Sequence, residues 1–114
     1  MPLNDWSDNI IIAELSDEPA FSDDLDALQA RLDQTGSNGT APDVILNMRA
    51  VTYLNSSNLA QLLRLRKRIT LTGRRLRICS VNDSVWSVLL TTGLDSVFNF
   101  TEDVSTSLAS LQIN

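Results

Sequence analysis

Residues 43–71 read DVILNMRAVTYLNSSNLAQLLRLRKRITL, and this stretch decides the fold. Residues 44–46 form a continuous apolar run rich in β-branched side chains, which is typical of a strand covered on both faces. The polar turn Asn-Ser-Ser-Asn follows at 55–58. Asn and Ser begin helices because their side chains accept hydrogen bonds from free backbone N–H groups. The leucines at 59–65 then predict a helix with one apolar face, so the turn lies between a buried strand and a helix N-terminus.

The rest of the chain alternates between strand and helix patterns in the same way. Further strands are predicted at 10–15, 76–81 and 97–100, and helices near 23–34, 57–71, 84–92 and 102–111. Such alternation implies parallel pairing, so the expected fold is α/β, with a mostly parallel sheet of four or five strands and about four helices. Ile45 and Leu46, in the central strand, are expected to be almost fully buried.

The expected helix ends carry capping residues. Ser22 should cap the first helix, with Asp23, Asp24 and Asp26 in its first turn; Gly73 should end the second; Asn82 or Asp83 should cap the third and Gly93 end it; Thr101 should cap the last. Aspartates at a helix start complement the helix dipole, which explains this acidic cluster better than Mg²⁺ binding does.

Length and composition indicate one domain over residues 1–114, with a core at about 9–111. The chain is 43% hydrophobic and has no apolar run of the roughly 20 residues that a transmembrane helix needs. It contains no His and one cysteine, Cys79, so Cys/His metal sites, His-based triads and an internal disulfide are excluded. The first nine residues lack a signal peptide pattern, and we expect a cytoplasmic protein without membrane insertion, cofactor or metal.

Charge is unevenly distributed along the chain. The net charge is −5, yet seven of the nine basic residues lie within 64–77, and eight of the 14 acidic residues lie within 1–26. Two interpretations remain open. The segments are solvated faces that differ in sign, or the basic segment contacts an acidic partner. Direct nucleic-acid binding is disfavoured because the whole chain is acidic and the basic segment lacks interleaved aromatic residues.

The turn at 53–59, Tyr-Leu-Asn-Ser-Ser-Asn-Leu, resembles the STAS domain of bacterial anti-sigma factor antagonists. In that family an Asp-Ser-Ser/Thr-Gly-Leu signature follows a buried strand and opens a helix. The resemblance extends to the glycine turn and strand at 72–79, the helix that ends in Gly93-Leu94, and the aromatic segment at 98–100. It covers about residues 9–111, and it leaves open whether the first family strand is missing or lies within 3–7.

The resemblance implies a function and a set of site residues. Members of the family bind an anti-sigma factor that is also a serine kinase, and phosphorylation of one serine switches them off. That serine corresponds to Ser56, with Ser57 as the neighbouring alternative, and the partner-binding turn would comprise Asn55, Ser56, Ser57 and Asn58. Two positions depart from the family signature, since Asn55 replaces an acidic residue and Asn58 replaces a glycine.

Other roles for the turn remain open. Ser56 or Asn55 caps the helix in any case, and phosphorylation is an additional role that the resemblance alone suggests. The alternative function is a STAS binding module or scaffold subunit in a transport or sensory complex, without serine chemistry. An enzyme is disfavoured, because the sequence has no His, no glycine-rich phosphate loop and no nucleophile elbow. The sequence makes no prediction of oligomeric state.

Overall fold

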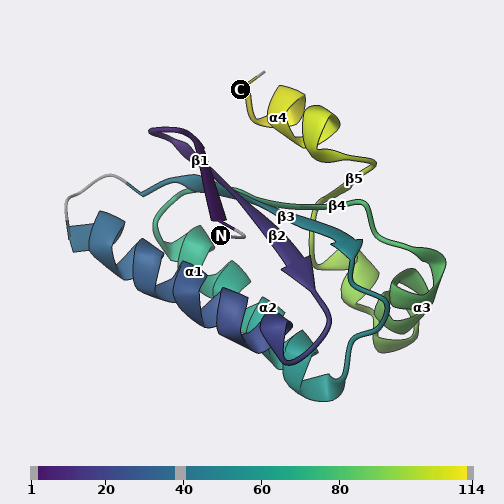
Figure 1. The fold of residues 1–114 in the computed structure, drawn as a ribbon. Helices are drawn as coiled ribbons and strands as arrows, with labels where there is room; N and C mark the ends of the chain where they lie inside the picture. The colour runs from purple at the N-terminus through teal and green to yellow at the C-terminus, as the bar shows by residue number, and fades with distance from the viewer. Residues whose placement is uncertain (1–2, 38–40, 113–114) are drawn as a thin grey trace.

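The computed structural model describes residues 3–37 and 41–112, which form a five-stranded sheet with helices on both faces (Figure 1). The strands lie across the sheet in chain order: β1 (Leu3–Ser7), β2 (Ile10–Ser16), β3 (Asp43–Ala50), β4 (Leu76–Cys79) and β5 (Phe100–Thr101). β1 pairs antiparallel with β2, and all other neighbouring strands are parallel. The predicted α/β fold is confirmed, and residues 3–7 do form a strand.

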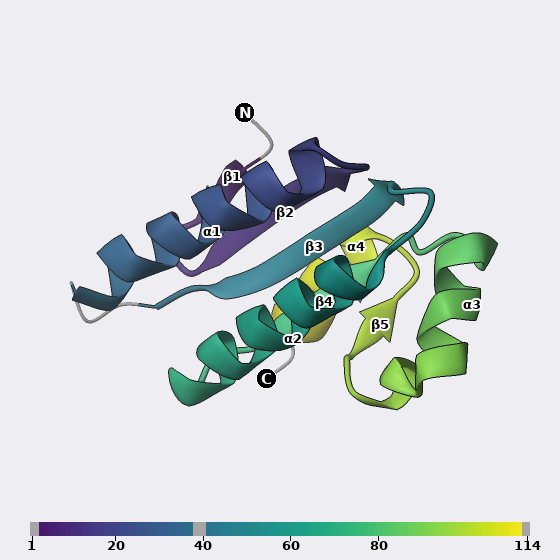
Figure 2. The same cartoon turned by 90° about the horizontal axis from the view of Figure 1, so that it is seen from below.

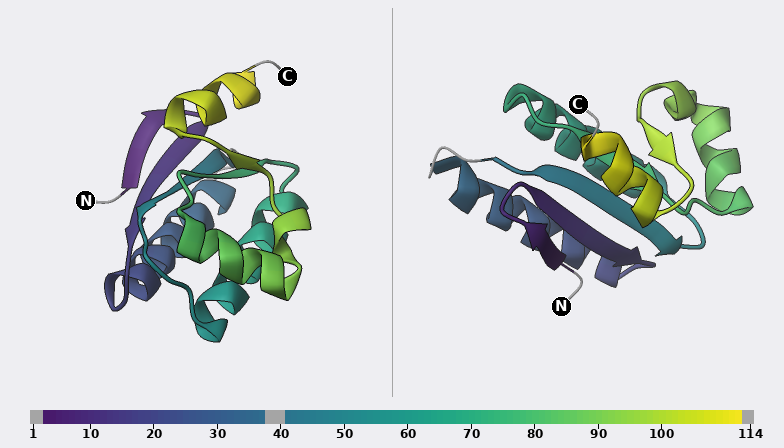
Figure 3. Two further views of the ribbon diagram at one scale, coloured as in Figure 1. Left: turned by 90° about the vertical axis from the view of Figure 1, so that its right-hand side faces the viewer. Right: turned by 90° about the horizontal axis from the view of Figure 1, so that it is seen from above.

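Four helices cover the sheet. They are α1 (Ala20–Ser37), α2 (Ser56–Leu71), α3 (Asp83–Thr92) and α4 (Val104–Gln112), and a short 3₁₀ helix, η1 (Leu94–Ser96), follows α3. α1 and α2 lie side by side against one face, as the view from below shows (Figure 2). α3 lies on that same side, and α4 lies on the opposite side (Figure 3). Within the described ranges, no helix is both long enough and apolar enough to cross a membrane.

The central strand β3 supplies side chains to two separate cores. Leu46 belongs to the larger core under α1, α2 and α3, whereas Ile45 belongs to a smaller core under α4. Both residues are 0% exposed, which confirms the predicted burial. The continuous apolar run in the sequence follows directly, because successive side chains of a strand point to opposite faces and here both faces are covered.

The start of α1 differs from the prediction. The helix begins at Ala20, so Ser22 lies inside its first turn instead of capping it. Glu18 takes the capping role, because its carboxylate accepts hydrogen bonds from the Ser22 backbone N–H (2.8 Å) and the Ser22 hydroxyl (2.5 Å). Of the three aspartates, Asp23 alone falls in the first turn. The prediction failed because the helix starts two residues earlier than Ser22. Ser22 then supplies one of the free backbone N–H groups of the first turn, and the Glu18 carboxylate, two residues before the helix, accepts the hydrogen bond from it.

The C-terminal elements are shorter than predicted. β4 ends at Cys79, because Ser80 has a φ of 60° and turns the chain out of the sheet. β5 contains only Phe100–Thr101, so Val97 and Phe98 precede it. Thr101 does not cap α4; the Asp103 carboxylate does, accepting a hydrogen bond of 2.8 Å from the Thr106 backbone N–H.

Three other predicted helix ends are confirmed. Asn82 caps α3 through a 2.9 Å hydrogen bond from the Val85 backbone N–H. Gly73 and Gly93 end α2 and α3, and each has a φ of 77°, in the left-handed region that L side chains rarely adopt.

The dual burial of β3 predicts a large cost for truncating Leu46. This residue lies in register with Ala13 of β2 and Ile78 of β4, so a shorter side chain leaves a cavity that the sheet cannot close. Leu46→Ala should lower the free energy of unfolding by about 2–5 kcal/mol in urea titrations. Leu71→Ala is the matched control because Leu71 is 78% exposed, and it should change that free energy by less than about 0.5 kcal/mol. Equal effects of the two substitutions would contradict the central position of β3.

Candidate functional site

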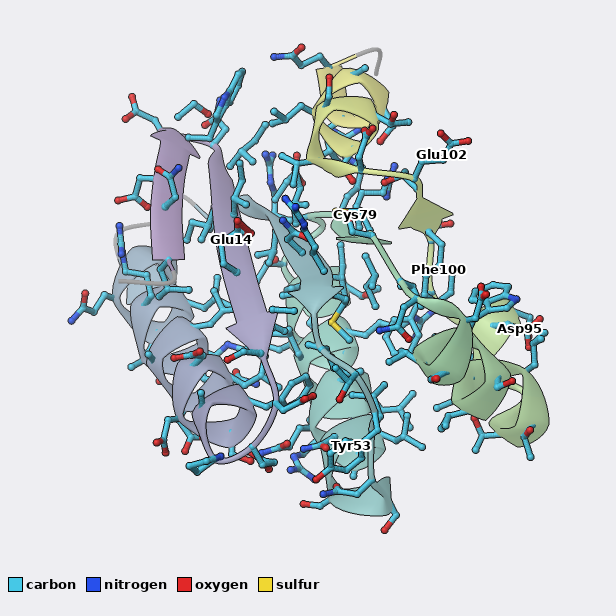
Figure 4. All side chains as sticks on the ribbon, turned by 45° about the vertical axis from the view of Figure 1, so that its right-hand side comes forward. Glu14, Tyr53, Cys79, Asp95, Phe100 and Glu102 are labelled. Atoms are coloured by element: carbon cyan, nitrogen blue, oxygen red, sulfur yellow. The ribbon has the colours of Figure 1, made fainter. Side chains whose placement is uncertain are left out.

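The serine turn lies at the carboxyl end of β3. Ser56 and Ser57 are the first two residues of α2, and both are exposed. Elsewhere in the described chain, no side chain or backbone group makes a hydrogen bond with either hydroxyl. Tyr53, in the same connection, is also 50% exposed (Figure 4). The turn therefore presents two hydroxyl groups and one aromatic ring to solvent.

The two asparagines of the turn hold the helix start together. The Asn55 side chain accepts a hydrogen bond of 2.8 Å from the Asn58 backbone N–H, and the Asn58 side chain accepts one of 3.1 Å from the Asn55 backbone N–H. This reciprocal pair is a capping box built from two asparagines. It satisfies the helix start without using either serine hydroxyl, so Asn55 and not Ser56 caps α2.

Asn58 faces the interior of the domain and is 2% exposed. Its side-chain amide donates hydrogen bonds to Glu18 Oε2 (3.0 Å) and Gln61 Oε1 (3.2 Å). Gln61 in turn donates to the Ser22 hydroxyl (3.0 Å), which donates to the same carboxylate of Glu18. The side chain that replaces the family glycine is thus inside the domain, where it joins α2 to the start of α1 and leaves the outer surface of the turn clear.

A second contact joins the loop before α1 to the connection between β3 and α2. The Asp17 carboxylate accepts hydrogen bonds from the Thr52 backbone N–H (2.8 Å) and the Thr52 hydroxyl (2.6 Å). These bonds hold the pKa of Asp17 below its ordinary value. The hydrogen bonds from the Ser22 hydroxyl and backbone, followed by that from Asn58, likewise lower the pKa of Glu18. Both carboxylates therefore stay ionised beside the turn at neutral pH.

A third contact comes from the opposite side. The Asn82 amide, which belongs to the cap of α3, donates a hydrogen bond of 2.5 Å to the Val51 carbonyl. The connection between β3 and α2 is thereby held by the chain that follows β2 and by the chain that follows β4. Because the scaffold is fixed on both sides, the serine hydroxyls and the first N–H groups of α2 have a defined position at the surface.

The chemistry available at this site is anion binding or modification of a hydroxyl. The Ser56 and Ser57 backbone N–H groups belong to the first turn of α2 and have no partner within the helix, and a helix N-terminus favours an anion by about 0.3–1 kcal/mol. The structure brings all four predicted residues, Asn55 to Asn58, into one turn, with the two serines facing outward.

Sequence reasoning missed the residues that support the turn. Asp17, Glu18 and Gln61 form the bonds that hold it, and Glu18 and Asn58 are 40 positions apart in the chain. The one local signal was the acidic side chain of Glu18 placed four residues before Ser22, at the start of an amphipathic segment. Its partner in α2 was not predictable from spacing.

The family model of the STAS domain matches residues 7–107. The chain therefore belongs to the STAS domain family, as the resemblance of its serine turn indicated. A comparison with curated protein sequences finds no match.

Three solved structures illustrate the likeness. A Thermotoga maritima protein provisionally assigned as an anti-sigma factor antagonist is 16% identical, with a TM-score of 0.74 over 97% of this chain and 93% of that one. The RsbS protein of Moorella thermoacetica, solved with a serine replaced by glutamate, is 13% identical, with a TM-score of 0.77 over 98% and 96%. A sulfate transporter family protein from Wolinella succinogenes is 21% identical, with a TM-score of 0.75 over 91% and 85%. At these identities the likeness shows a common fold.

The lowered pKa of Glu18 predicts an acid-dependent loss of stability. A carboxylate whose pKa is lower in the folded state stabilises the fold above its unfolded pKa, and this contribution disappears as the pH falls through the folded pKa. Glu18→Gln should therefore be less stable than the wild type at pH 7, and the difference should shrink as the pH falls below about 4. Urea unfolding at pH 7 and pH 3 measures both differences.

The control for this experiment is Glu14→Gln. Glu14 is an exposed glutamate on β2, so this variant removes one carboxylate without touching the Glu18 network. A stability difference for Glu18→Gln that is the same at both pH values would contradict the structural role of the ionised Glu18 side chain.

Proposed function

We propose that this STAS domain is an anti-sigma factor antagonist. It binds an anti-sigma factor that is also a serine kinase, through the exposed start of α2, and phosphorylation of Ser56 ends the binding. The binding and the phosphorylation both take place in the cytoplasm. The domain needs no cofactor, because the kinase partner supplies the catalytic groups and the ATP.

The observation that carries this proposal is the position of Ser56 in the structure. Ser56 is exposed at the first position of α2, while Asn55 and Asn58 make the capping bonds that a serine would otherwise make. Its hydroxyl is therefore available to a kinase without loss of a structural hydrogen bond. The likeness of the fold to a provisionally assigned antagonist and to RsbS adds support from two further members of this structural class.

A phosphate at Ser56 would change the charge of the docking surface more than its shape. It adds between about −1.5 and −2 charges at pH 7. Asp17 and Glu18 already contribute two negative charges to the loop that supports the turn, through their contacts with Thr52 and Asn58. The helix N-terminus stabilises the phosphate locally, so the domain stays folded, whereas a partner surface that fits the unmodified turn meets a dense negative charge.

Asn55 and Asn58 motivate the second candidate function. Asn55 cannot supply the carboxylate that the family signature places before the serine, and the Asn58 side chain is committed to Glu18 and Gln61. A domain of this kind can act as a constitutive binding module or scaffold, and one protein of the same fold belongs to the sulfate transporter family. The two functions differ in whether the kinase modifies the domain that it binds.

The switch predicts one added phosphate, and intact mass spectrometry measures it. Incubation of the protein with the candidate kinase and ATP should add the mass of a single phosphate to the wild type. Ser56→Ala should prevent the addition, whereas Ser57→Ala, one position along the same exposed turn, should retain it. Ser56→Asp should weaken binding to the kinase, although one carboxylate imitates a phosphate dianion only in part.

Urea unfolding of Ser56→Ala provides the folding control. Its stability should match that of the wild type closely, within about 0.5 kcal/mol, because the hydroxyl makes no structural hydrogen bond with the described residues. Phosphate retained in Ser56→Ala and lost in Ser57→Ala would move the site to Ser57. Tight binding of the kinase with no change in mass would reject the switch and support the constitutive binding module.

A further inference from the structure

The layer formed by α1 and α2 carries charges of opposite sign on its two helices (Figure 2). Its acidic half is the outer surface of α1, where the exposed residues include Asp23, Asp26, Ala27, Ala30 and Asp33. Its basic half is the outer surface of α2, where the exposed residues include Leu63, Arg64, Lys67 and Leu71. Helix α2 has no acidic residue, and the basic residue of α1, Arg31, is turned toward β1, where it pairs with Asp5. One surface of the domain therefore has an acidic half beside a basic half.

The charges at the centre of this surface are not neutralised within the domain. Asp33 pairs with Arg68 near the C-terminal ends of the two helices. Across residues 3–37 and 41–112, by contrast, the side chains of Asp26, Arg64 and Lys67 form neither an ion pair nor a hydrogen bond. These three groups are therefore available to opposite charges on another molecule.

Asp26 and Arg64 lie at the same level along the two helices. Both line a groove of about 320 Å³ that runs between α1 and α2. The two helices point in the same direction, because each returns the chain between parallel strands. The hydrogen bond of 3.0 Å from Gln61 to Ser22 joins them about one turn before this pair, which fixes the level of one helix against the other.

We propose that a second copy of this chain docks on the layer formed by α1 and α2, in a dimer whose twofold axis runs along the helices. An axis in this direction places α1 of each copy over α2 of the other. Rotation about the axis keeps each residue at its level along the helices, so Asp26 of one copy meets Arg64 of the other, and symmetry forms this contact twice. An axis across the helices would place the acidic surface of α1 against itself, which like charges oppose.

The other exposed side chains of this surface suit a contact between helices. Ala27 and Ala30 are small and allow close approach on α1, whereas Leu63 (38% exposed) and Leu71 (78% exposed) provide apolar contact on α2. Helices of 18 and 16 residues form a layer about 25 Å long and about 20 Å wide, so each copy would bury roughly 500 Å². The total of roughly 1,000 Å² is at the lower limit for a specific interface. The dimer should therefore be weak and should form at high protein concentration.

A second copy fits this surface better than other charged partners do. An acidic protein, a nucleic acid or an anionic membrane would complement the basic half and be repelled by the acidic half beside it, whereas a second copy complements both. The net charge of −5 on each chain opposes association. At about 0.15 M salt, however, charges farther apart than about 8 Å are largely screened, and the pairs in direct contact are closer than that.

The test is sedimentation equilibrium of the purified protein at concentrations from about 1 μM to 1 mM, where we expect a monomer–dimer equilibrium. Arg64→Glu and Asp26→Arg should each weaken the dimer by about tenfold or more, because each substitution creates two pairs of like charges in a symmetric dimer. Arg49→Glu is the matched control, since it makes the same charge change at an exposed residue of β3, and it should leave the affinity within about twofold of the wild type.

A mixture of the two charge-reversal variants gives the sharpest result. In a dimer of one Arg64→Glu chain with one Asp26→Arg chain, both contacts again join opposite charges. The equimolar mixture should therefore dimerise within about threefold of the wild-type affinity, although neither variant does so alone. This recovery also shows that both variants are folded, because an unfolded chain could not restore the interface.

Several outcomes would overturn the proposal. A single species of monomer mass up to about 1 mM would do so, and weaker binding of the candidate kinase to Arg64→Glu would then assign the basic half of the layer to an acidic partner. Equal losses of affinity in Arg49→Glu and Arg64→Glu would show that total charge controls the association. A mixture of the two variants that stays monomeric would place the contact elsewhere. Ser56→Ala should dimerise as the wild type does, so this outcome is separate from that of the proposed serine switch.

Discussion

The parallel pairing of β2 with β3 is the constraint on which the rest of the structure depends. The pairing places Ile12 beside Ile45 and Ala13 beside Leu46, and the two faces of β3 enter different cores. A strand without a solvent-facing side needs helices on both faces of its sheet. Parallel neighbours also need a crossover between them, which α1, α2 and α3 provide in turn. The burial of one strand therefore determines where α1, α2 and α4 must lie.

The same pairing explains why the serine turn is well supported. Because β2 and β3 run in the same direction, the chain leaving β2 and the chain leaving β3 emerge at the same edge of the sheet. Asp17 then reaches Thr52, and Glu18 reaches Asn58, although about 35–40 residues separate each pair. These contacts satisfy the polar groups that a turn would otherwise bury without partners. The exposed hydroxyls of Ser56 and Ser57 remain outside this network, which separates the groups that maintain the fold from the groups available for modification.

Helix α2 joins two regions of opposite chemical character. Its first turn carries two serine hydroxyls and lies beside the ionised Asp17 and Glu18, whereas its second half and the chain that follows it carry the seven basic residues of positions 64–77. The helix dipole favours an anion at the N-terminus and a cation in the last turn, where Arg68 lies. Ion pairs between Asp43 and Arg74 and Arg75 account for part of the basic segment, which is neither a purely solvated face nor wholly free to meet a partner.

The sequence by itself determined the parts of this protein that depend on local pattern. The apolar run at 44–46 predicted a strand buried on both faces, and the glycines at 73 and 93 marked the helix ends, because side-chain periodicity and left-handed backbone geometry are properties of neighbouring residues. The tertiary structure alone decided the partners of those segments. It assigned the cap of α1 to Glu18 instead of Ser22, turned Asn58 inward, and paired Arg74 and Arg75 with Asp43. Such contacts depend on which strands are neighbours in the sheet, and no spacing within a single segment encodes that order.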